Sequence, residues 1–454
     1  MDRNVSSRRG QAPATAPGGR GPAAVGRVLA VMLALTLSLA LAGCSGSDHG
    51  GGGAGGEQQT IRFAWWGDST RLATTRKVLK AFEQQNPGIT VEVETTGDTD
   101  AYFDKLATEM AANDAPDLMT LGGAYPREYS DRGALLDLSK VSAQLDLSKF
   151  PDSTLAASKF DGIGYGVPTG GNAIGLLINP KVFAAAGVDL PDTSTWTWED
   201  FVKIAGQVSA NSPKGTYGFE PRVNDTLGVY AQQRGTPIYD TQGKLAVAPQ
   251  TVADYWRMEQ ELIKNKGMPS AAAVQELANV TPEQTLMGQG KAAMTIGYSN
   301  LLGSYAEASG AALKLVTVPG ARQYRYAGPT VLPSQYYAIS ARSEHTEAAA
   351  KLLSFLVNSP TAGKLIMDDR GMPFQTEVMK SIKPGLDRYG KANSAYLAGV
   401  AKNGTPTAPI PPAGGSALND VTSKLDSDVL FGRAAPDAAA QDWHKQLEDA
   451  LANS

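Results

Sequence analysis

The chain has 454 residues, of which 42% are hydrophobic, enough to bury one large core or two moderate ones. Its formal net charge is −4 at pH 7, and residues 1–43 hold five Arg against one Asp, a charge of +4, so the remainder carries −8. No cluster of Lys and Arg follows residue 43, so the basic stripe that neutralises nucleic-acid phosphates is missing. The composition argues against a disordered chain and against a nucleic-acid-binding protein.

The N-terminus has the pattern of an export signal. Several Arg precede the apolar run 28–42, which ends at Leu41-Ala42-Gly43-Cys44. This run is shorter than the roughly 20 residues that span a bilayer, and a small-residue cleavage site follows it. Cys44 is the only cysteine, so a disulfide cannot account for it. An ordinary signal peptide that leaves a free thiol is the alternative to an anchor at this cysteine.

Leu41-Ala42-Gly43-Cys44 resembles the lipobox of bacterial lipoproteins. The resemblance implies that the thiol of Cys44 takes a diacylglycerol after residues 1–43 are removed. Residues 44–59 are rich in Gly and Ser, a composition that behaves as a flexible tether. We expect an exported protein that is lipid-anchored at the extracytoplasmic face of the cell membrane.

The folded part begins with alternating strand and helix patterns. Residues 60–66 form an apolar run, residues 72–82 have helical spacing, and Ile89, Val91 and Val93 alternate with polar residues. A further helix and the strand 116–121 follow, so the order predicts an α/β fold with a parallel sheet. Ligands of such sheets bind beyond the carboxyl ends of the strands. The loops 66–68 and 122–125 are therefore the first site candidates.

Later segments predict a crossing between lobes and further helices. The Gly-rich segment 169–172 precedes an apolar run and is interpreted as the crossing. Thr281, Pro282 and Gln284 have the pattern of a capping box, which predicts a helix from Pro282 to about Gly288. The remaining tryptophans are expected to be structural; these are Trp196, Trp198, Trp256 and Trp443.

Several segments together resemble the extracellular solute-binding proteins of carbohydrate ABC importers, the maltose-binding-protein-like family. The segments that carry the resemblance are Phe63-Ala64-Trp65-Trp66-Gly67, Tyr165-Gly166-Val167-Pro168, Leu177-Ile178-Asn179-Pro180-Lys181-Val182-Phe183, Ala186-Gly187-Val188, Thr195-Trp196-Thr197-Trp198-Glu199-Asp200-Phe201, Gly288-Gln289-Gly290-Lys291-Ala292-Ala293-Met294 and Arg370-Gly371-Met372-Pro373. Their order covers most of residues 60–454, behind the lipobox. The resemblance implies a two-lobe periplasmic-binding-protein-like fold, with the ligand cleft between lobes joined by crossing hinge strands.

The resemblance also implies that each lobe is discontinuous in sequence. We assign 60–168 plus 319–370 to lobe 1 and 169–318 plus 371–454 to lobe 2. Two motifs depart from the family pattern: Pro333-Ser334-Gln335-Tyr336 replaces paired glycines, and Tyr298-Ser299 replaces a common Trp. The identity of the ligand is therefore not carried over.

A sugar needs aromatic platforms for its ring faces and planar polar groups for its hydroxyls. The predicted platforms are Trp66, Tyr125, Tyr298 and Tyr336. The predicted hydroxyl partners are Asp68, Asn172, Ser299 and Gln335, while Arg71 is expected to bridge to an acidic partner. Of the adjacent pair at the strand end, Trp65 is the expected core residue. A structural role is the alternative for Trp66, Tyr298 and Tyr125, and for Tyr125 that role would be to cover a helix end.

Enzymatic function lacks a reactive group in the sequence. The three histidines are His49 in the tether, His345 before a helix and His444 in a terminal helix, so a Ser-His-Asp arrangement is hard to build. A glycoside hydrolase with paired carboxylates stays as an alternative. So do a lipoprotein that presents a ligand to a sensor kinase, an adhesin, and a non-sugar ligand. We expect no catalytic residue, no cofactor and no metal site.

The resemblance implies three partners for the protein. They are a carbohydrate ligand, the membrane permease subunits of an ABC importer, and the membrane itself through the lipid on Cys44. We expect a monomer and no nucleic-acid partner.

Overall fold

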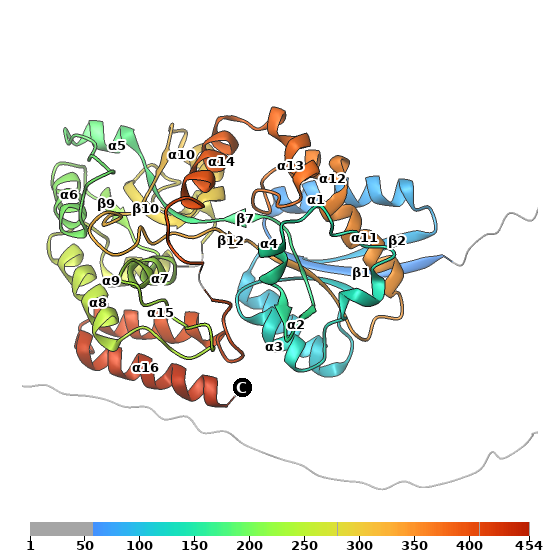
Figure 1. Ribbon diagram of the computed structural model, residues 1–454. Helices are drawn as coiled ribbons and strands as arrows, with labels where there is room; N and C mark the ends of the chain where they lie inside the picture. Colours follow the sequence, from blue (N-terminus) through green and yellow to red (C-terminus); the bar gives the residue numbers. More distant parts are fainter. Residues whose placement is uncertain (1–57, 279, 408, 454) are drawn as a thin grey trace, which may run out of the picture. The chain divides into compact units, whose positions relative to one another are not determined.

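The computed structural model describes residues 58–278, 280–407 and 409–453. Cys44, the signal segment 1–43 and the tether up to residue 57 lie outside the described residues. The described chain builds two main sheets, each with helices packed on both faces (Figure 1). This arrangement confirms the predicted α/β class.

The first sheet has five strands in the spatial order β2-β1-β3-β13-β6. Strand β1 is parallel to β2 and β3, as predicted, whereas β13 is antiparallel to β3 and β6. The strand bounds are β1 (Gln59–Trp66), β2 (Ile89–Thr96), β3 (Leu118–Leu121), β6 (Val167–Pro168) and β13 (Tyr336–Ile339). A small hairpin lies beside this sheet, formed by β4 (Lys159–Phe160) and β5 (Ile163–Gly164).

Helices of the first lobe pack on both faces of this sheet. The α-helices are α1 (Ser69–Gln85), α2 (Thr99–Ala112), α3 (Tyr125–Asp131), α4 (Asp152–Ala156), α11 (Thr346–Asn358) and α12 (Pro360–Ile366), with a 3₁₀ turn η1 (Leu138–Val141). Asp68 and Asp98 cap α1 and α2 by accepting hydrogen bonds from backbone N–H groups, which satisfies donors that a helix start leaves free.

The alternation along β1 decides which tryptophan enters the core. Phe63 and Trp65 belong to the cluster that α1 and α11 cover, and Trp65 is 1% exposed. Trp66 points to the opposite face, where it packs against Tyr102 and Phe103 of α2. The side chains of a strand point to alternate faces, so the prediction that Trp65 is the core residue is confirmed.

The second sheet has four strands in the order β11-β8-β10-β9. Its strands are β8 (Ile174–Ile178), β9 (Tyr217–Glu220), β10 (Ala292–Tyr298) and β11 (Lys314–Val316). Strand β10 is parallel to β9 and antiparallel to β8. The α-helices around it are α5 (Pro180–Ala185), α6 (Trp198–Ala210), α7 (Val223–Gln233), α8 (Pro249–Lys264), α9 (Ala271–Glu276), α10 (Leu302–Ser309), α14 (Arg388–Val400), α15 (Ala417–Leu430) and α16 (Pro436–Ala452). Short 3₁₀ turns are η2 (Pro282–Gln284), η3 (Ser299–Leu301) and η4 (Lys383–Gly385).

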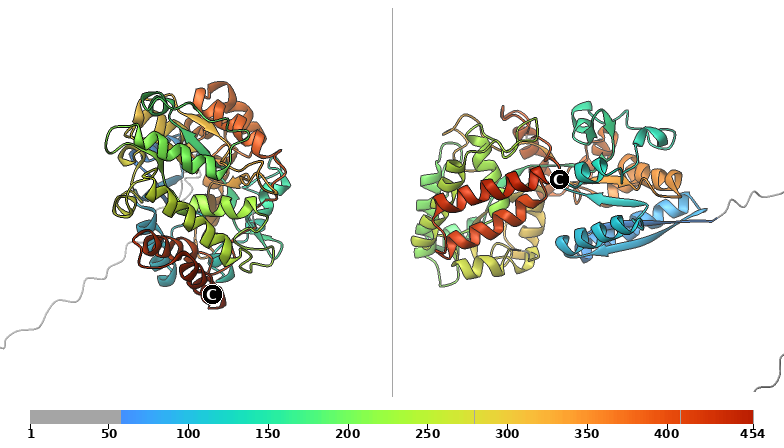
Figure 2. Two further views of the ribbon diagram at one scale, coloured as in Figure 1. Left: turned by 90° about the vertical axis from the view of Figure 1, so that its left-hand side faces the viewer. Right: turned by 90° about the horizontal axis from the view of Figure 1, so that it is seen from below.

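The largest core cluster lies between this sheet and α6, α8, α15 and α16. Figure 2 shows α15 and α16 side by side, in agreement with their packing. The tryptophans expected to be structural are confirmed in that role, because all of them are buried in this cluster: Trp196, Trp198, Trp256 and Trp443.

The prediction of a helix from Pro282 to about Gly288 is wrong in length. The capping box between Thr281 and Gln284 is present, but only the 3₁₀ turn Pro282–Gln284 follows it. The backbone becomes extended at Thr285 (φ −69°, ψ 159°). The capping pattern is therefore real, and tertiary packing ends the helix after one turn.

Three segments run between the two sheets and contact one another. Strand β7 (Gly171–Asn172) pairs with β12 (Leu332–Pro333), and Gly171 also forms a bridge with Met372 (Figure 1). A Cβ on Gly170 would lie 2.5 Å from the backbone of Gly371, so only glycine allows this close approach.

The exact lobe boundaries stay a prediction. Helix α13 (Thr376–Ile382) falls in the range assigned to lobe 2, yet it packs against α12 beside the first sheet. No helix in the described parts of the chain is long and apolar enough to cross a membrane.

Candidate functional site

The carboxyl ends of strands from both sheets face a cleft between the lobes. In the first lobe these are the loops after β1, β2 and β3, and in the second lobe the loops after β9 and β10. The cleft holds a larger cavity of about 1320 Å³ and a smaller one of about 640 Å³. Arg222 and Ala278 line both cavities, so the two meet at the loop that follows β9.

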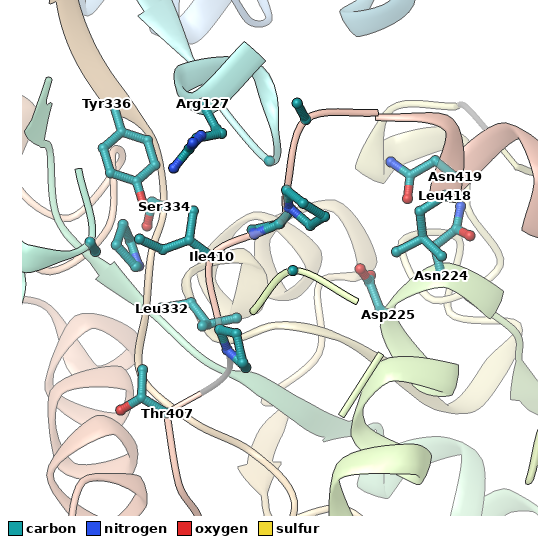
Figure 3. A pocket seen from close by; sticks show the side chains of 18 of the residues that line it. Arg127, Asn224, Asp225, Leu332, Ser334, Tyr336, Thr407, Ile410, Leu418 and Asn419 are labelled. Atoms are coloured by element: carbon teal, nitrogen blue, oxygen red, sulfur yellow. The ribbon is translucent and has the colours of Figure 1, made fainter. Parts of the chain in front are cut away.

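The larger cavity combines aromatic, apolar and charged side chains (Figure 3). Tyr336 and Arg127 come from the first lobe, Asp225 from the second, and Ile410 from the segment before α15. Arg127 is already paired, because its Nε lies 2.7 Å from Asp131. Its guanidinium also lies 5.4 Å from the centroid of the Phe160 ring. These contacts fix the side chain of Arg127, which lines the cavity.

Asp225 is a carboxylate of this cavity that lacks an ion-pair partner. It lies in the first turn of α7, and among the described residues no Lys or Arg forms an ion pair with it. Burial raises the pKa of Asp225 to about 6, although the nearby Arg222 lowers it. A half-buried carboxylate in a cleft is a strong acceptor for ligand donors.

Two of the predicted platforms line the larger cavity. Tyr298 ends β10 and is 40% exposed, while Tyr336 begins β13 and is 8% exposed. The charge of Asp225 raises the pKa of Tyr298, and both residues line the larger cavity. An exposed aromatic ring beside a carboxylate offers a ring face and an acceptor together.

Four other predicted residues line the smaller cavity: Trp66, Asp68, Arg71 and Ser299. Arg71 does meet an acidic partner, since its Nε lies 3.1 Å from Asp369. Asp68 accepts a hydrogen bond from the backbone N–H of Arg71 at 2.8 Å. The hydroxyl of Ser299 accepts one from the N–H of Ala173 at 3.3 Å. These contacts hold the loop after β1 and the crossing segment in place.

The remaining predicted residues line neither of these two cavities. Tyr125 stacks on Phe103 with ring centroids 3.8 Å apart. Asn172 is 5% exposed within β7, and its Oδ1 lacks a hydrogen-bond partner in the described structure. Gln335 is 7% exposed, and its carbonyl accepts a hydrogen bond from Thr169. Tyr125, Asn172 and Gln335 therefore belong to the packing behind the cleft.

Sequence reasoning selected the loop 122–125 after β3 but missed Arg127 beyond it, and it missed the residues that follow β2 and β9. The missed residues that line the cavities are Asp98, Asp100, Arg127, Arg222, Asn224 and Asp225. The same signal that selected Trp66 and Asp68, a strand that ends in Gly or Pro before polar residues, is present at Gly97-Asp98 and at Pro221-Arg222. In the described residues no group of His, Cys, Asp and Glu could hold a metal ion.

Comparison with known proteins places this cleft in context. Residues 66–362 match the family of bacterial extracellular solute-binding proteins. The chain belongs to this family. The resemblance inferred from the motifs is thereby confirmed, and the family is one of substrate-binding proteins rather than enzymes.

Relatives of this solute-binding protein extend over most of its length. A putative binding protein of Brucella abortus is 25% identical over 379 residues, which cover 81% of this chain and 87% of the relative. The diacetylchitobiose binding protein DasA of Streptomyces coelicolor is 24% identical over 360 residues, covering 76% and 80%.

The two-lobe fold of this solute-binding protein is confirmed by solved structures. A periplasmic oligogalacturonide binding protein from Yersinia enterocolitica, solved with saturated digalacturonic acid, has a TM-score of 0.78. Its identity is 22%, and the alignment covers 87% of this chain and 100% of that one. At this identity the likeness establishes the fold alone.

Proposed function

We propose that this protein is the lipid-anchored substrate-binding component of an ABC importer, and that it binds a sugar or oligosaccharide in the interlobe cleft. It delivers that ligand to the permease subunits, acts as a monomer, and uses neither a catalytic residue nor a cofactor. Family membership alone fixes neither the ligand class, nor the anchor, nor the partner.

The observation that carries the ligand class is the larger cavity with its aromatic and polar lining. Tyr298 is 40% exposed and lines this cavity, so its ring is open to a ligand there. A sugar ring packs on such a face, while its hydroxyls need groups that accept and donate hydrogen bonds. Asp225 and Asn224 line the same cavity as Tyr298.

We assign the ligand contacts to the predicted residues that line the cavities, together with those found from the geometry. Tyr298, Tyr336 and Trp66 serve as platforms, and Asp225 accepts hydroxyl hydrogens. Tyr125, Asn172 and Gln335 act through the residues that they support. The volume of about 1320 Å³ exceeds the range of about 300–1,000 Å³ that is usual for small-molecule pockets, which favours an oligosaccharide.

The ligands named for related proteins support a carbohydrate. One relative is a diacetylchitobiose binding protein, and one structural neighbour was solved with digalacturonic acid. Both ligands are disaccharides that differ in charge and substituents, so the fold accommodates this ligand class without fixing its chemistry.

The anchor and the location are inferred from residues outside the described structure. Lipidation of Cys44 would hold the folded part at the extracytoplasmic face of the membrane, because each buried CH₂ of an acyl chain contributes about 0.8 kcal/mol. Incorporation of a labelled fatty acid into the chain, abolished in Cys44→Ala, is the expected result. Labelling that persists in this variant rules out Cys44 as the anchor site.

The three crossing segments act as the hinge for ligand binding and release. Closure about these segments brings both cavity walls onto the ligand, and the permease then recognises the closed form and separates the lobes.

A thermal-shift screen of the full chain against mono-, di- and oligosaccharides tests the ligand class. A ligand at 100 times its Kd stabilises the native state by about 2.7 kcal/mol, so a clear rise in Tm is expected for at least one sugar. If no carbohydrate raises the Tm while an amino acid, a peptide or a polyamine does, the carbohydrate proposal is wrong.

A further inference from the structure

The smaller cavity of the cleft is strongly acidic. Its charged lining residues are Asp68, Asp98, Asp100, Asp368, Asp369 and Asp387 on the acidic side and Arg71 and Arg222 on the basic side. These side chains come from both lobes. The acidic groups therefore outnumber the basic ones, and some of them lack an ion-pair partner among the described residues.

Most of the acidic groups have a local role. Asp369 pairs with Arg71 at 3.1 Å. Asp68, Asp98 and Asp387 each accept backbone N–H hydrogen bonds at the start of a helix, where the helix dipole favours a negative charge. The carboxylates of Asp100 and Asp368 remain.

Asp100 lies among other acidic groups. Partial desolvation, and then repulsion from Asp98, Asp420 and Asp104, raises its pKa. Asp420 belongs to α15 of the second lobe, so like charges face each other across the cleft. Among the described residues no Lys or Arg lies within ion-pair distance of Asp100.

Asp368 is half-buried just before the third crossing segment. Burial raises its pKa, Asn393 lowers it, and the neighbouring Asp387 and Asp369 raise it further. In the described part of the chain no cation pairs with its carboxylate either. Asp100 and Asp368 thus line the smaller cavity with negative charge that no Lys or Arg of the described chain pairs.

Arg222 does not supply the missing charge. Its guanidinium donates a hydrogen bond to the hydroxyl of Tyr305 at 2.8 Å. The acidic groups that raise the pKa of Arg222 are Glu220 and Asp225, together with the Tyr305 hydroxyl. Glu220 is the buried last residue of β9 and lines neither cavity, whereas Asp225 lines the larger one. Arg222 thus donates to Tyr305, and among the described residues it forms no ion pair with an acidic group of the smaller cavity.

Unused hydrogen-bond acceptors provide an independent observation. Asn393 is 1% exposed and lines the smaller cavity, yet neither its Oδ1 nor its Nδ2 has a hydrogen-bond partner among the described residues. The Oδ1 of Asn300, in the same lining, also lacks a donor. Buried acceptors are normally paired, so this cavity has room for a group that donates several hydrogen bonds.

We propose that the smaller cavity binds the ammonium group of an amino sugar, with Asp100 and Asp368 as counter-charges and Asn393 as an acceptor. An ammonium group supplies three donors and one positive charge, which matches what this cavity lacks. The inference rests on the proposed sugar-binding function and narrows it to cationic carbohydrates.

The test compares the affinity of the full chain for matched pairs of sugars by calorimetry. The probes are glucosamine and glucose, galactosamine and galactose, and the β-1,4-linked oligomers of glucosamine and of glucose. We expect the amino member of each bound pair to bind at least about tenfold more tightly, or about 1.4 kcal/mol.

The variants Asp100→Asn and Asp368→Asn should remove this preference, because each should lower the affinity for the amino sugar towards that of its neutral partner. Asp100 is exposed, so its variant keeps the test valid if the Asp368 variant does not fold. Glu92→Gln is the matched control, since Glu92 is exposed on β2 and lines neither cavity. It should retain the preference.

A pH series adds a second readout. Protonation of Asp100 and Asp368 removes the counter-charges, so affinity for the amino sugar should fall as the pH is lowered through the carboxyl range. Affinity for the neutral sugar should change less.

Two results distinguish the inference from the function on which it rests. Neutral sugars that bind as tightly as their amino partners, or a preference that survives both variants, overturn the ammonium site and leave the sugar-binding function intact. Failure of every sugar to bind overturns both.

Discussion

The carboxylate of Glu128 accepts a hydrogen bond from the backbone N–H of Gly414 at 3.1 Å. The same oxygen accepts a second one from Ser416 at 3.3 Å. Glu128 lies on α3 of the first lobe, and Gly414 shortly precedes α15 of the second. This contact joins the lobes at a point away from the three crossing segments, and it places a negative charge at a helix start.

Replacement of Glu128 should weaken this interlobe contact. Hydrogen bonds to a charged group contribute about 1.5–3 kcal/mol, so Glu128→Ala should lower the free energy of unfolding by about that amount. Glu128→Gln keeps an acceptor and should cost less. Urea denaturation measures both, with Glu92→Gln as the control; equal stability of all three variants contradicts the assigned contact.

Tyr298 and Trp65 should behave in opposite ways when truncated. Tyr298 is 40% exposed and Trp65 1% exposed. Tyr298→Ala should weaken sugar binding roughly tenfold or more and change stability by about 0.5 kcal/mol or less. Trp65→Ala should cost about 3–5 kcal/mol of stability. Denaturation curves together with binding titrations separate the two effects, and a large loss of stability in Tyr298→Ala would argue against its role as a platform.

The crossing segments should not tolerate a side chain at Gly170. A Cβ there would lie 2.5 Å from backbone atoms of Gly371, so Gly170→Ala should destabilise the protein by more than about 1 kcal/mol. A Cβ added at Gly399, in α14, would meet no atom within 4 Å. Gly399→Ala should therefore stabilise by about 0.4–1 kcal/mol. Thermal unfolding gives the sign of each change, and the same sign for both would contradict the packing described at the crossing.

The buried carboxyls of Glu259 and Asp426 should make stability depend on pH. Burial raises the pKa of both carboxyls, and each carboxyl also changes the pKa of the other. Asp426 accepts a hydrogen bond from Trp256 at 3.1 Å, and Glu259 accepts one from the Tyr255 hydroxyl at 2.8 Å. A carboxyl whose pKa is raised by folding stabilises the native state while protonated, and this stability is lost as the pH rises from the unfolded-state pKa towards the folded-state pKa.

Glu259→Gln should reduce that loss, because the variant cannot ionise at this position. Denaturation at mildly acidic and mildly alkaline pH measures the difference for both proteins. A wild-type stability that falls no more steeply with rising pH than that of the variant contradicts the assignment.

Local patterns in the sequence predicted those parts of the fold that they determine. The alternation of Phe63, Ala64 and Trp65 indicated the correct buried face, because a strand places side chains by a period of two. The capping box at Thr281 is also real, but the helix after it is not, since packing around Thr285 outweighs local propensity. Element lengths depend on such contacts.

The sequence prediction selected those parts of the site where a strand end carried an aromatic residue. Trp66 and Tyr298 were selected in this way and line the cavities. Asp225 lies on a helix start that carries no motif, and only the fold brings it into the same cavity lining as Tyr298, which is distant in sequence. Tyr125 was selected by the same pattern as Trp66, but its ring stacks on Phe103 and lines neither cavity. Whether a side chain in such a loop lines the cavity depends on the residues that pack beside it.

Calorimetric titration of the full chain with the sugar that stabilises it most, beside Tyr298→Ala and Asp225→Asn, tests the central claim most directly. Saturable binding by the wild-type protein, weakened by roughly tenfold or more in each variant, is the predicted result. Binding that is unchanged in both variants would contradict the claim that the interlobe cleft is the sugar site.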